Sequence, residues 1–270
     1  MDDTERHQSN RLAWNEAAAR YAQDIDADIA FLRGGGTHFC PPEREFLAGL
    51  GEWCGRAIHL QCAGGCDTLS LWNLGAREVV GVDISEAMLA CARAKSDALQ
   101  APAQWVQCDI LETPHALDGT ADLVYTGRGA LCWMMDLPAW ARVVARLLKP
   151  GGRLYVFEGH PLAWVWDQGA EHFRLDPVYG DYFDGRIHTD NAWPETYIPA
   201  TCEPAPGYAP KHERQHTLAQ IVNALLNANL GLLRLGEHPD RYWRSMPNMA
   251  DVELDRLPHT FSLLMERTTA

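Results

Sequence analysis

The sequence lacks the features of several classes of protein. It has no long uncharged apolar run, and its first residues, MDDTERHQSNR, are polar. We therefore expect neither a membrane span nor a secretion signal, and a cytoplasmic location. Basic residues are few, because 23 Lys+Arg against 36 Asp+Glu give a formal net charge of −13. Such a surface repels phosphate backbones, so nucleic acid is a poor candidate partner.

The spacing of the cysteines is not that of a metal site. Eight cysteines stand at positions 40, 54, 62, 66, 91, 108, 132 and 202, with no C-x-x-C pair among them. Several lie in apolar runs, where cysteine behaves as a small hydrophobic residue. His172, His188 and Asp181 are likewise irregularly spaced. We therefore expect reduced thiols and no bound metal.

Strand and helix patterns alternate along most of the chain. Residues 10–32 read as a helix, and a shorter helical stretch runs from Pro41 to about Gly51. Apolar runs at 57–61, 78–83, 103–108, 121–126 and 153–158 then alternate with helical patterns at 66–74, 85–99 and 136–148. The order predicts an α/β fold, a Rossmann-like and mainly parallel seven-stranded sheet with helices on both faces. A capping box, Thr217-x-x-Gln220, opens a later helix, and 232–237 and 260–266 are the last two strands.

Residues 160–215 interrupt the alternation. This stretch is rich in proline, glycine, aspartate and aromatic residues. Because it continues so far without clear periodicity, it is too long for an ordinary loop. We divide the chain into an N-terminal helical cap (1–52), a Rossmann-like core (53–159), an aromatic-rich insertion (160–215), and a helix with two strands that complete the core (216–270). The insertion is interpreted as a substrate lid, with a dimer interface as the alternative.

Candidate binding residues stand where strands end, because ligands of open α/β sheets bind beyond the carboxyl ends of the strands. Small residues at Ala63, Gly64 and Gly65 let the backbone approach a ligand closely. Asp83 ends the second strand, where a carboxylate accepts hydrogen bonds from the hydroxyls of a ribose. Asp109 follows the third strand and is a candidate for contact with an adenine amino group, with Ile84 and Ile110 on either side of the ring.

These motifs together resemble the class I S-adenosylmethionine-dependent methyltransferases that act on small molecules. LQCAGGCDT looks like the first motif of the family, GVDIS like the second, QCDI like the third and ADLVYTGRGALCW like the fourth. LLKPGGRLYVFE is similar to the segment that leads into the fifth strand. The resemblance covers residues 55 to 158 and the end of the chain, and it implies S-adenosylmethionine as cofactor and S-adenosylhomocysteine as product.

The first motif departs from the family pattern at three positions. Gln61 replaces the usual Asp or Glu, Ala63 replaces the first glycine and Asp67 replaces the last. Gln61 offers a carbonyl oxygen but no charge to the ammonium of the cofactor, and Asp67 is the candidate that restores the charge. The resemblance also implies that the N-terminal helix closes over the cofactor, with Trp14, Asn15 and Tyr21 facing it. The complete set of cofactor contacts that the resemblance implies is Tyr21, Gln61, Ala63, Gly64, Gly65, Asp67, Asp83, Ile84, Met88, Cys108, Asp109, Ile110, Thr126 and Gly127.

We expect transfer of a methyl group to a nitrogen or oxygen atom of a small-molecule acceptor. His160, directly after the fifth strand, is the candidate base, because the ordinary pKa of histidine suits proton transfer near neutrality. Trp133, Trp164, Tyr182 and Trp193 are the candidate acceptor contacts. Two alternatives stay open. One is a protein that binds the cofactor without transferring methyl. The other is a nicotinamide oxidoreductase, which normally carries G-x-G-x-x-G where this chain has AGGCDT.

Overall fold

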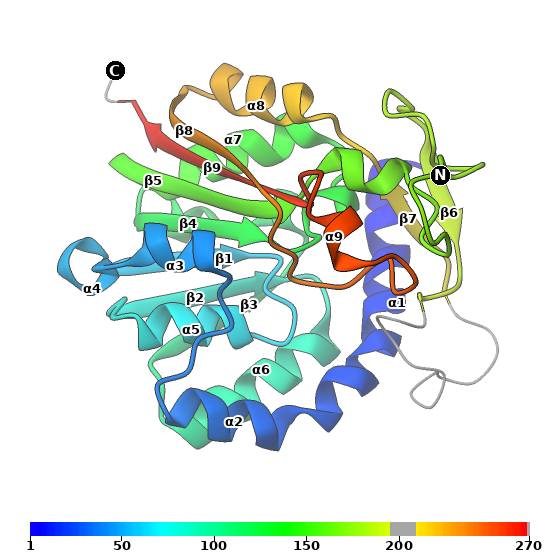
Figure 1. Ribbon diagram of the computed structural model, residues 1–270. Helices are drawn as coiled ribbons and strands as arrows, with labels where there is room; N and C mark the ends of the chain where they lie inside the picture. The colour runs from blue at the N-terminus through cyan, green and yellow to red at the C-terminus, as the bar shows by residue number, and fades with distance from the viewer. Residues whose placement is uncertain (195–208, 269–270) are drawn as a thin grey trace.

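Seven strands form one sheet in the order β3-β2-β1-β4-β5-β9-β8 in the computed structural model, which describes residues 1–194 and 209–268 (Figure 1). The strands are β1 Arg56–Leu60, β2 Glu78–Asp83, β3 Ala103–Gln107, β4 Ala121–Gly127, β5 Leu148–Gly159, β8 Leu230–His238 and β9 Thr260–Arg267. Neighbouring strands from β3 to β5 are parallel, and β9 runs antiparallel to both β5 and β8. The predicted mainly parallel seven-stranded sheet is confirmed.

The helices between the strands begin where their capping residues predict. Ser85 Oγ accepts a hydrogen bond from the Met88 amide at the start of α6 (Glu86–Leu99), at 3.1 Å. Asp136 caps α7 (Leu137–Leu147), and Thr217 with Gln220 forms the expected capping box of α8 (Leu218–Asn227). Together with α5 (Cys66–Asn73), these are the helices that the sequence pattern predicts.

Side chains alternate across the sheet, so each strand contributes to two cores. Ile58 and Val80 belong to the larger core, which α7 and α8 cover. Their neighbours Ala57 and Val79 belong to the opposite core, beneath α3 to α5. The predicted coverage of both faces by helices is confirmed, and the carboxyl ends of β1, β2, β4 and β5 all meet one edge of the sheet.

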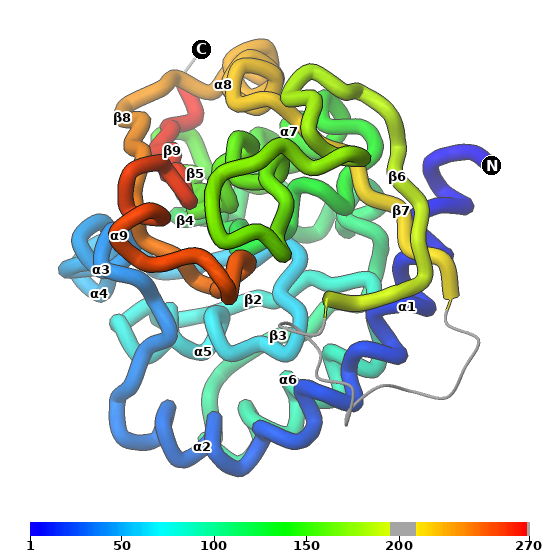
Figure 2. The backbone as a smooth tube through the Cα atoms, turned by 45° about the vertical axis from the view of Figure 1, so that its right-hand side comes forward, coloured from blue at the N-terminus to red at the C-terminus, as the bar shows by residue number. Residues whose placement is uncertain are grey.

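Four helices precede the first strand, namely α1 Asp3–Gln23, α2 Ile25–Arg33, α3 Pro41–Leu47 and α4 Leu50–Trp53. The prediction of one helix over 10–32 is wrong in two respects. Helix α1 begins earlier because Asp2 and Glu5 form a reciprocal capping box, and the chain turns at Asp24 between α1 and α2. In both views α1 stands beside the last segment of the insertion (Figure 2).

The insertion contains a short two-stranded sheet of β6 (Ile187–Asp190) and β7 (Lys211–Arg214), paired antiparallel. Asn10 of α1 holds β7 by its backbone: its Nδ2 donates to His212 O at 2.9 Å, and its Oδ1 accepts from His212 N at 2.6 Å. Residues 195–208 of the predicted lid lie outside the described residues, as does Cys202. The remaining short elements are α9 (Asp251–Leu254) and 3₁₀ turns at Ile110–Glu112, His115–Leu117, Leu131–Trp133 and Pro161–Val165.

None of the helices in the described ranges has the length and apolar character needed to cross a bilayer.

Candidate functional site

A cavity of about 1010 Å³ opens at the carboxyl-end edge of the sheet. Its walls come from α1, the loop after β1, the ends of β2, β4 and β5, the insertion, and the segment 241–245 between β8 and β9. Ligand pockets commonly measure roughly 300–1,000 Å³, so this cavity has room for a nucleoside cofactor and a second molecule.

The loop after β1 forms the floor of the cavity in a conformation that suits small residues. Gln61 and Ala63 have φ of 55° and 44°, and Gly65 has φ of 79°. A Cβ on Gly65 would lie 2.6 Å from the Trp105 ring, so glycine is required there. The Gln61 amide is already engaged, since Nε2 donates to Ala130 O at 2.8 Å and Oε1 accepts from Thr126 Oγ1 at 3.2 Å. Gln61 therefore links the loop to the end of β4.

Asp83 joins this loop to the start of α6. Its carboxylate accepts hydrogen bonds from the amides of Ala63 at 2.8 Å and Ser85 at 2.9 Å. The residue is buried yet lines the cavity, and burial raises the pKa of its carboxyl to about 6. A carboxylate has about four lone-pair positions, so Asp83 can accept further hydrogen bonds from a ligand in the cavity.

Asp109 lies next along the same edge, and it lines the cavity together with Ile84 and Ile110. Its Oδ2 lies 2.6 Å from His7 Nδ1, and His7 Nε2 accepts from the Met135 amide at 3.3 Å. Because Nε2 accepts, the neutral His7 ring carries its proton on Nδ1 and donates to Asp109. This buried contact fixes the start of α1 over the cavity.

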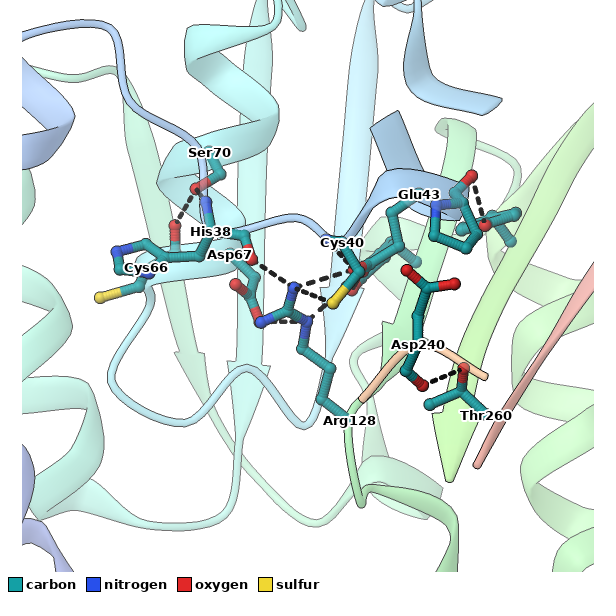
Figure 3. Close-up of polar contacts among 12 residues, drawn as sticks. His38, Cys40, Glu43, Cys66, Asp67, Ser70, Arg128, Asp240 and Thr260 are labelled. Atoms are coloured by element: carbon teal, nitrogen blue, oxygen red, sulfur yellow. Dashed lines mark hydrogen bonds and ion pairs between the residues drawn. The ribbon is translucent and has the colours of Figure 1, made fainter. Parts of the chain in front are cut away.

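A partly buried ionic cluster lies at the other end of the loop (Figure 3). The Arg128 guanidinium donates to Glu43 Oε2 at 2.8 Å, and its Nε lies 3.6 Å from Asp67 Oδ2. Tyr125 also donates to Glu43, at 2.5 Å. The nearby carboxylates raise the pKa of the Arg128 guanidinium, whereas burial lowers the pKa of the His59 imidazole to about 4 and keeps it neutral. Arg128 and Asp67 both line the cavity.

Three potential metal ligands gather beside this cluster. The ligand atoms of Asp28, His38 and Cys66 lie within 4.8 Å of one another. The buried Lys95 ammonium, however, lies 2.8 Å from Asp28 Oδ2 and 2.9 Å from Cys66 Sγ. The positive charge of Lys95 already balances Asp28 and would repel a cation, so we assign no metal to this group.

Aromatic side chains wall the opposite half of the cavity. Trp14 of α1 packs edge-on against Trp133 and Trp193, with ring centroids 5.2 and 4.9 Å apart, and all three line the cavity. The lining also includes Trp164, Trp166, Tyr179, Tyr242 and Trp243. Flat or apolar molecules fit such a surface.

Most of the predicted site residues line this one cavity. They are Tyr21, Gln61, Ala63, Gly64, Gly65, Asp67, Asp83, Ile84, Asp109, Ile110 and Gly127, with Trp133, Trp164 and Trp193 of the predicted acceptor contacts. Met88, Cys108 and Thr126 are not in the lining, and they contribute behind it: Met88 packs under α1, Cys108 packs against the larger core, and Thr126 bonds Gln61.

Three predicted positions require correction. His160 turns away from the cavity, since its Nε2 lies 2.9 Å from Glu237 Oε1 and its Nδ1 accepts from the Leu162 amide at 3.1 Å. With both nitrogens occupied by its own loop and β8, His160 has no access to an acceptor. Tyr182 is directed to the start of α8, where its hydroxyl accepts from the Leu218 amide at 3.3 Å. Asn15 bonds Ser85 and holds α1 on α6 instead of facing the cavity.

Sequence reasoning missed several lining residues. His7 and Asn10 lie in no motif, and Arg128 lies in the fourth motif without having been assigned a role. The roles of all three depend on contacts across more than 80 residues. The segment RYWRS, at 241–245, had a usable signal, because it is rich in aromatic residues and lies between two strands as the insertion does. Lys211 and Glu213 were also missed, since β7 is too short to show strand periodicity.

The core of the chain is similar to known proteins. Residues 58–156 match a family model described as a methyltransferase domain. The uncharacterised protein YafE of Escherichia coli (strain K12) is 34% identical over 111 residues, which are 40% of this chain and 53% of YafE. The 2-phytyl-1,4-naphtoquinone methyltransferase of Thermosynechococcus vestitus is 38% identical over 110 residues, 38% of this chain and 48% of that enzyme. The chain thus spans about half the length of the curated relatives it matches.

A solved structure extends the likeness to most of the fold. The S-adenosylmethionine-dependent methyltransferase from Mesorhizobium loti superposes with a TM-score of 0.60 at 21% identity, over 84% of this chain and 96% of that one. At this identity the likeness establishes the fold.

Proposed function

We propose that the protein is a class I S-adenosylmethionine-dependent methyltransferase that transfers a methyl group from S-adenosylmethionine to a small-molecule acceptor. The match of residues 58–156 to a methyltransferase domain and the likeness of the fold to a solved methyltransferase support this proposal. The proposal rests above all on one observation: the buried carboxylate of Asp83, at the end of β2, lines a cavity large enough for a nucleoside and a second molecule.

The proposed cofactor lies along the edge of the sheet. The ribose hydroxyls donate to Asp83, and the adenine lies between Ile84 and Ile110 with its amino group toward Asp109. The methionine end lies over Gly64 and Gly65, toward Asp67. The αL turn at Gly65 and the small residues beside it support this placement, because they let a ligand approach the backbone closely.

The acceptor occupies the aromatic half of the cavity. Trp133, Trp164 and Trp193 support a small and partly flat molecule with a nitrogen or oxygen nucleophile. A sulfonium is already a strong methyl donor, so the main tasks of the protein are to align nucleophile, methyl carbon and sulfur and to exclude water. Residues 160–194 and 241–245 form the lid in this proposal, and we propose a cytoplasmic location.

One alternative concerns the activity. A binding protein without transferase activity would hold the cofactor but form no product.

The other alternative concerns the insertion, which could form a dimer interface. Its outer face favours this role, because Leu175, Val178 and Phe183 are exposed there, the last by 81%. The inner face of the insertion can act as a lid while its outer face forms an interface. We therefore propose a homodimer contact for the outer face only.

A thermal-shift assay tests the proposal. Ligand at about 100 times its dissociation constant stabilises the native state by about 2.7 kcal/mol, so S-adenosylhomocysteine should raise the melting temperature. NADH at the same concentration should leave it unchanged. Stabilisation by NADH alone would overturn the proposed function in favour of the oxidoreductase.

A further inference from the structure

One carboxylate in the cavity differs from the other acidic lining residues. Among the described residues, each other acidic side chain of the lining bonds a basic group or a backbone amide. These residues are Asp24, Asp28, Asp67, Asp83, Asp109, Asp167, Asp176 and Asp190. The side chain of Glu213 has neither a hydrogen bond nor an ion pair within the described ranges, although Glu213 lines the same cavity. Its side chain is half-buried, and burial raises the pKa of its carboxyl to about 7.

The β6–β7 pair explains why Glu213 has no basic partner. Lys211 and Glu213 are two residues apart on β7, so their side chains share a face of the strand. Lys211, the basic neighbour, is already paired with Asp190 on β6 and lies over the Trp193 ring, 5.5 Å from its centroid. His188, which stands opposite Glu213, has its Nε2 3.3 Å from Asp184. No basic group in the described ranges therefore bonds Glu213, and the charge of Lys211 offsets that of Glu213 only in part.

The surroundings of Glu213 belong to the proposed acceptor half. The Cys132 thiol and the Tyr179 hydroxyl lie close enough for the charge of Glu213 to raise the pKa of each. Cys132 directly precedes Trp133, which packs with Trp14 and Trp193, and Trp14 stands on the helix that covers the adenine end. A flat aromatic surface and one unpaired negative charge thus face the same space. Aromatic faces and carboxylates both attract organic cations.

We propose that the acceptor is an aliphatic amine that binds as its ammonium ion against these tryptophans, and that Glu213 is the catalytic residue that removes its proton. This inference rests on the proposed function. The ammonium N–H proton passes to the Glu213 carboxylate, which leaves a neutral nitrogen with a free electron pair. That pair forms the bond to the methyl carbon as the carbon–sulfur bond breaks, and the electrons of that bond stay on sulfur. The products are S-adenosylhomocysteine and a methylated ammonium ion.

The proton transfer suits the position of Glu213. A base acts best when its pKa lies near the working pH, and a carboxyl of ordinary pKa would be a weak acceptor for an ammonium proton. Burial raises the pKa of Glu213 and so brings it closer to the pKa of an alkylammonium ion. His160, the base predicted from sequence, has no such access because both its nitrogens are occupied.

The test compares an amine with its neutral counterpart on protein saturated with S-adenosylhomocysteine or supplied with S-adenosylmethionine. The probes are 2-phenylethylamine and tryptamine, against 2-phenylethanol. Wild-type protein should bind the amines, seen as a further rise in melting temperature, and methylate at least one of them, seen by mass spectrometry. Glu213→Gln should lower kcat/KM for that amine at least 30-fold and abolish the amine-induced stabilisation. Its affinity for S-adenosylhomocysteine should stay within threefold of wild type.

Glu45→Gln is the matched control, because Glu45 is an exposed carboxylate that pairs with Arg234 outside the cavity. It should behave as wild type in every assay. Methylation or binding of 2-phenylethanol with no response to the amines would overturn the inference, as would full activity of Glu213→Gln. Neither result affects the proposed function, provided that S-adenosylhomocysteine binds. If that ligand fails to bind the wild type, the proposed function itself is overturned.

Discussion

Asp83 offers the sharpest test of where the cofactor binds, through the variant Asp83→Asn. The Asp83 carboxylate accepts hydrogen bonds from two backbone amides, and burial raises its pKa to about 6. Relative to an ordinary value of 3.8, this raised pKa means that ionised Asp83 lowers the stability of the fold by roughly 3 kcal/mol at pH 8. The associated stability is present below pH 4 and is lost as the pH rises through 6.

Ribose hydroxyls donate to the charged form, so cofactor binding lowers the pKa of Asp83 and releases a proton below pH 6. Asparagine offers one carbonyl oxygen in place of two charged oxygens. We expect it to weaken S-adenosylhomocysteine binding at pH 8 by about 2–4 kcal/mol, or roughly 30- to 700-fold. At pH 5 the wild type loses up to about tenfold in affinity and the variant does not, so the gap between them narrows.

Isothermal titration calorimetry at pH 5 and pH 8 measures the ratio of the wild-type affinity to the affinity of Asp83→Asn. Titration of the ligand affects both proteins equally, so it cancels in this ratio. Asp122→Asn is the matched control, because Asp122 also accepts two backbone amides, from Gly55 and Arg56, at the opposite edge of the sheet. It should lose stability and keep its affinity. A folded Asp83→Asn protein with unchanged affinity, or a ratio that is the same at both pH values, would refute the assignment of the ribose to Asp83.

Three further substitutions probe the loop, the aromatic wall and the corrected histidine. Ala63→Gly should stabilise the protein by about 0.5–1 kcal/mol in chemical denaturation, because Ala63 has φ of 44° and glycine tolerates that conformation; a loss of stability would contradict the strain. Trp193→Ala should raise the acceptor KM and leave S-adenosylhomocysteine affinity within about threefold, roughly 0.65 kcal/mol, whereas Trp193→Phe should keep most of the function; a changed sedimentation coefficient with normal KM would instead favour the interface. His160→Ala should leave the pH profile of kcat unchanged, and loss of the fall in kcat at low pH would restore His160 as the base.

Much of the fold could be predicted because local signals decide it. Ser85, Asp136 and the Thr217–Gln220 capping box fixed helix starts, and the apolar runs at 78–83 and 121–126 fixed the central strands. The break at Asp24 escaped prediction because it carries neither proline nor glycine. Local patterns were thus sufficient for the core elements.

The candidate site was predictable only where it follows strand ends. Asp83 and Asp109 are placed by the sheet itself, and both line the cavity. Glu213 and Arg128 depend on contacts between distant segments, such as Asn10 with His212 and Arg128 with Glu43, which no local pattern contains. His160 was placed correctly after β5, but the direction of its side chain is decided by Glu237 on β8.

A crystal structure of the S-adenosylhomocysteine complex tests the central claim most directly. We predict density for both ribose hydroxyls about 2.5–3.0 Å from the Asp83 carboxylate, the adenine between Ile84 and Ile110, and the sulfur directed toward Trp133 and Glu213. Density for the nucleoside outside this cavity, or with its ribose turned away from Asp83, would contradict it.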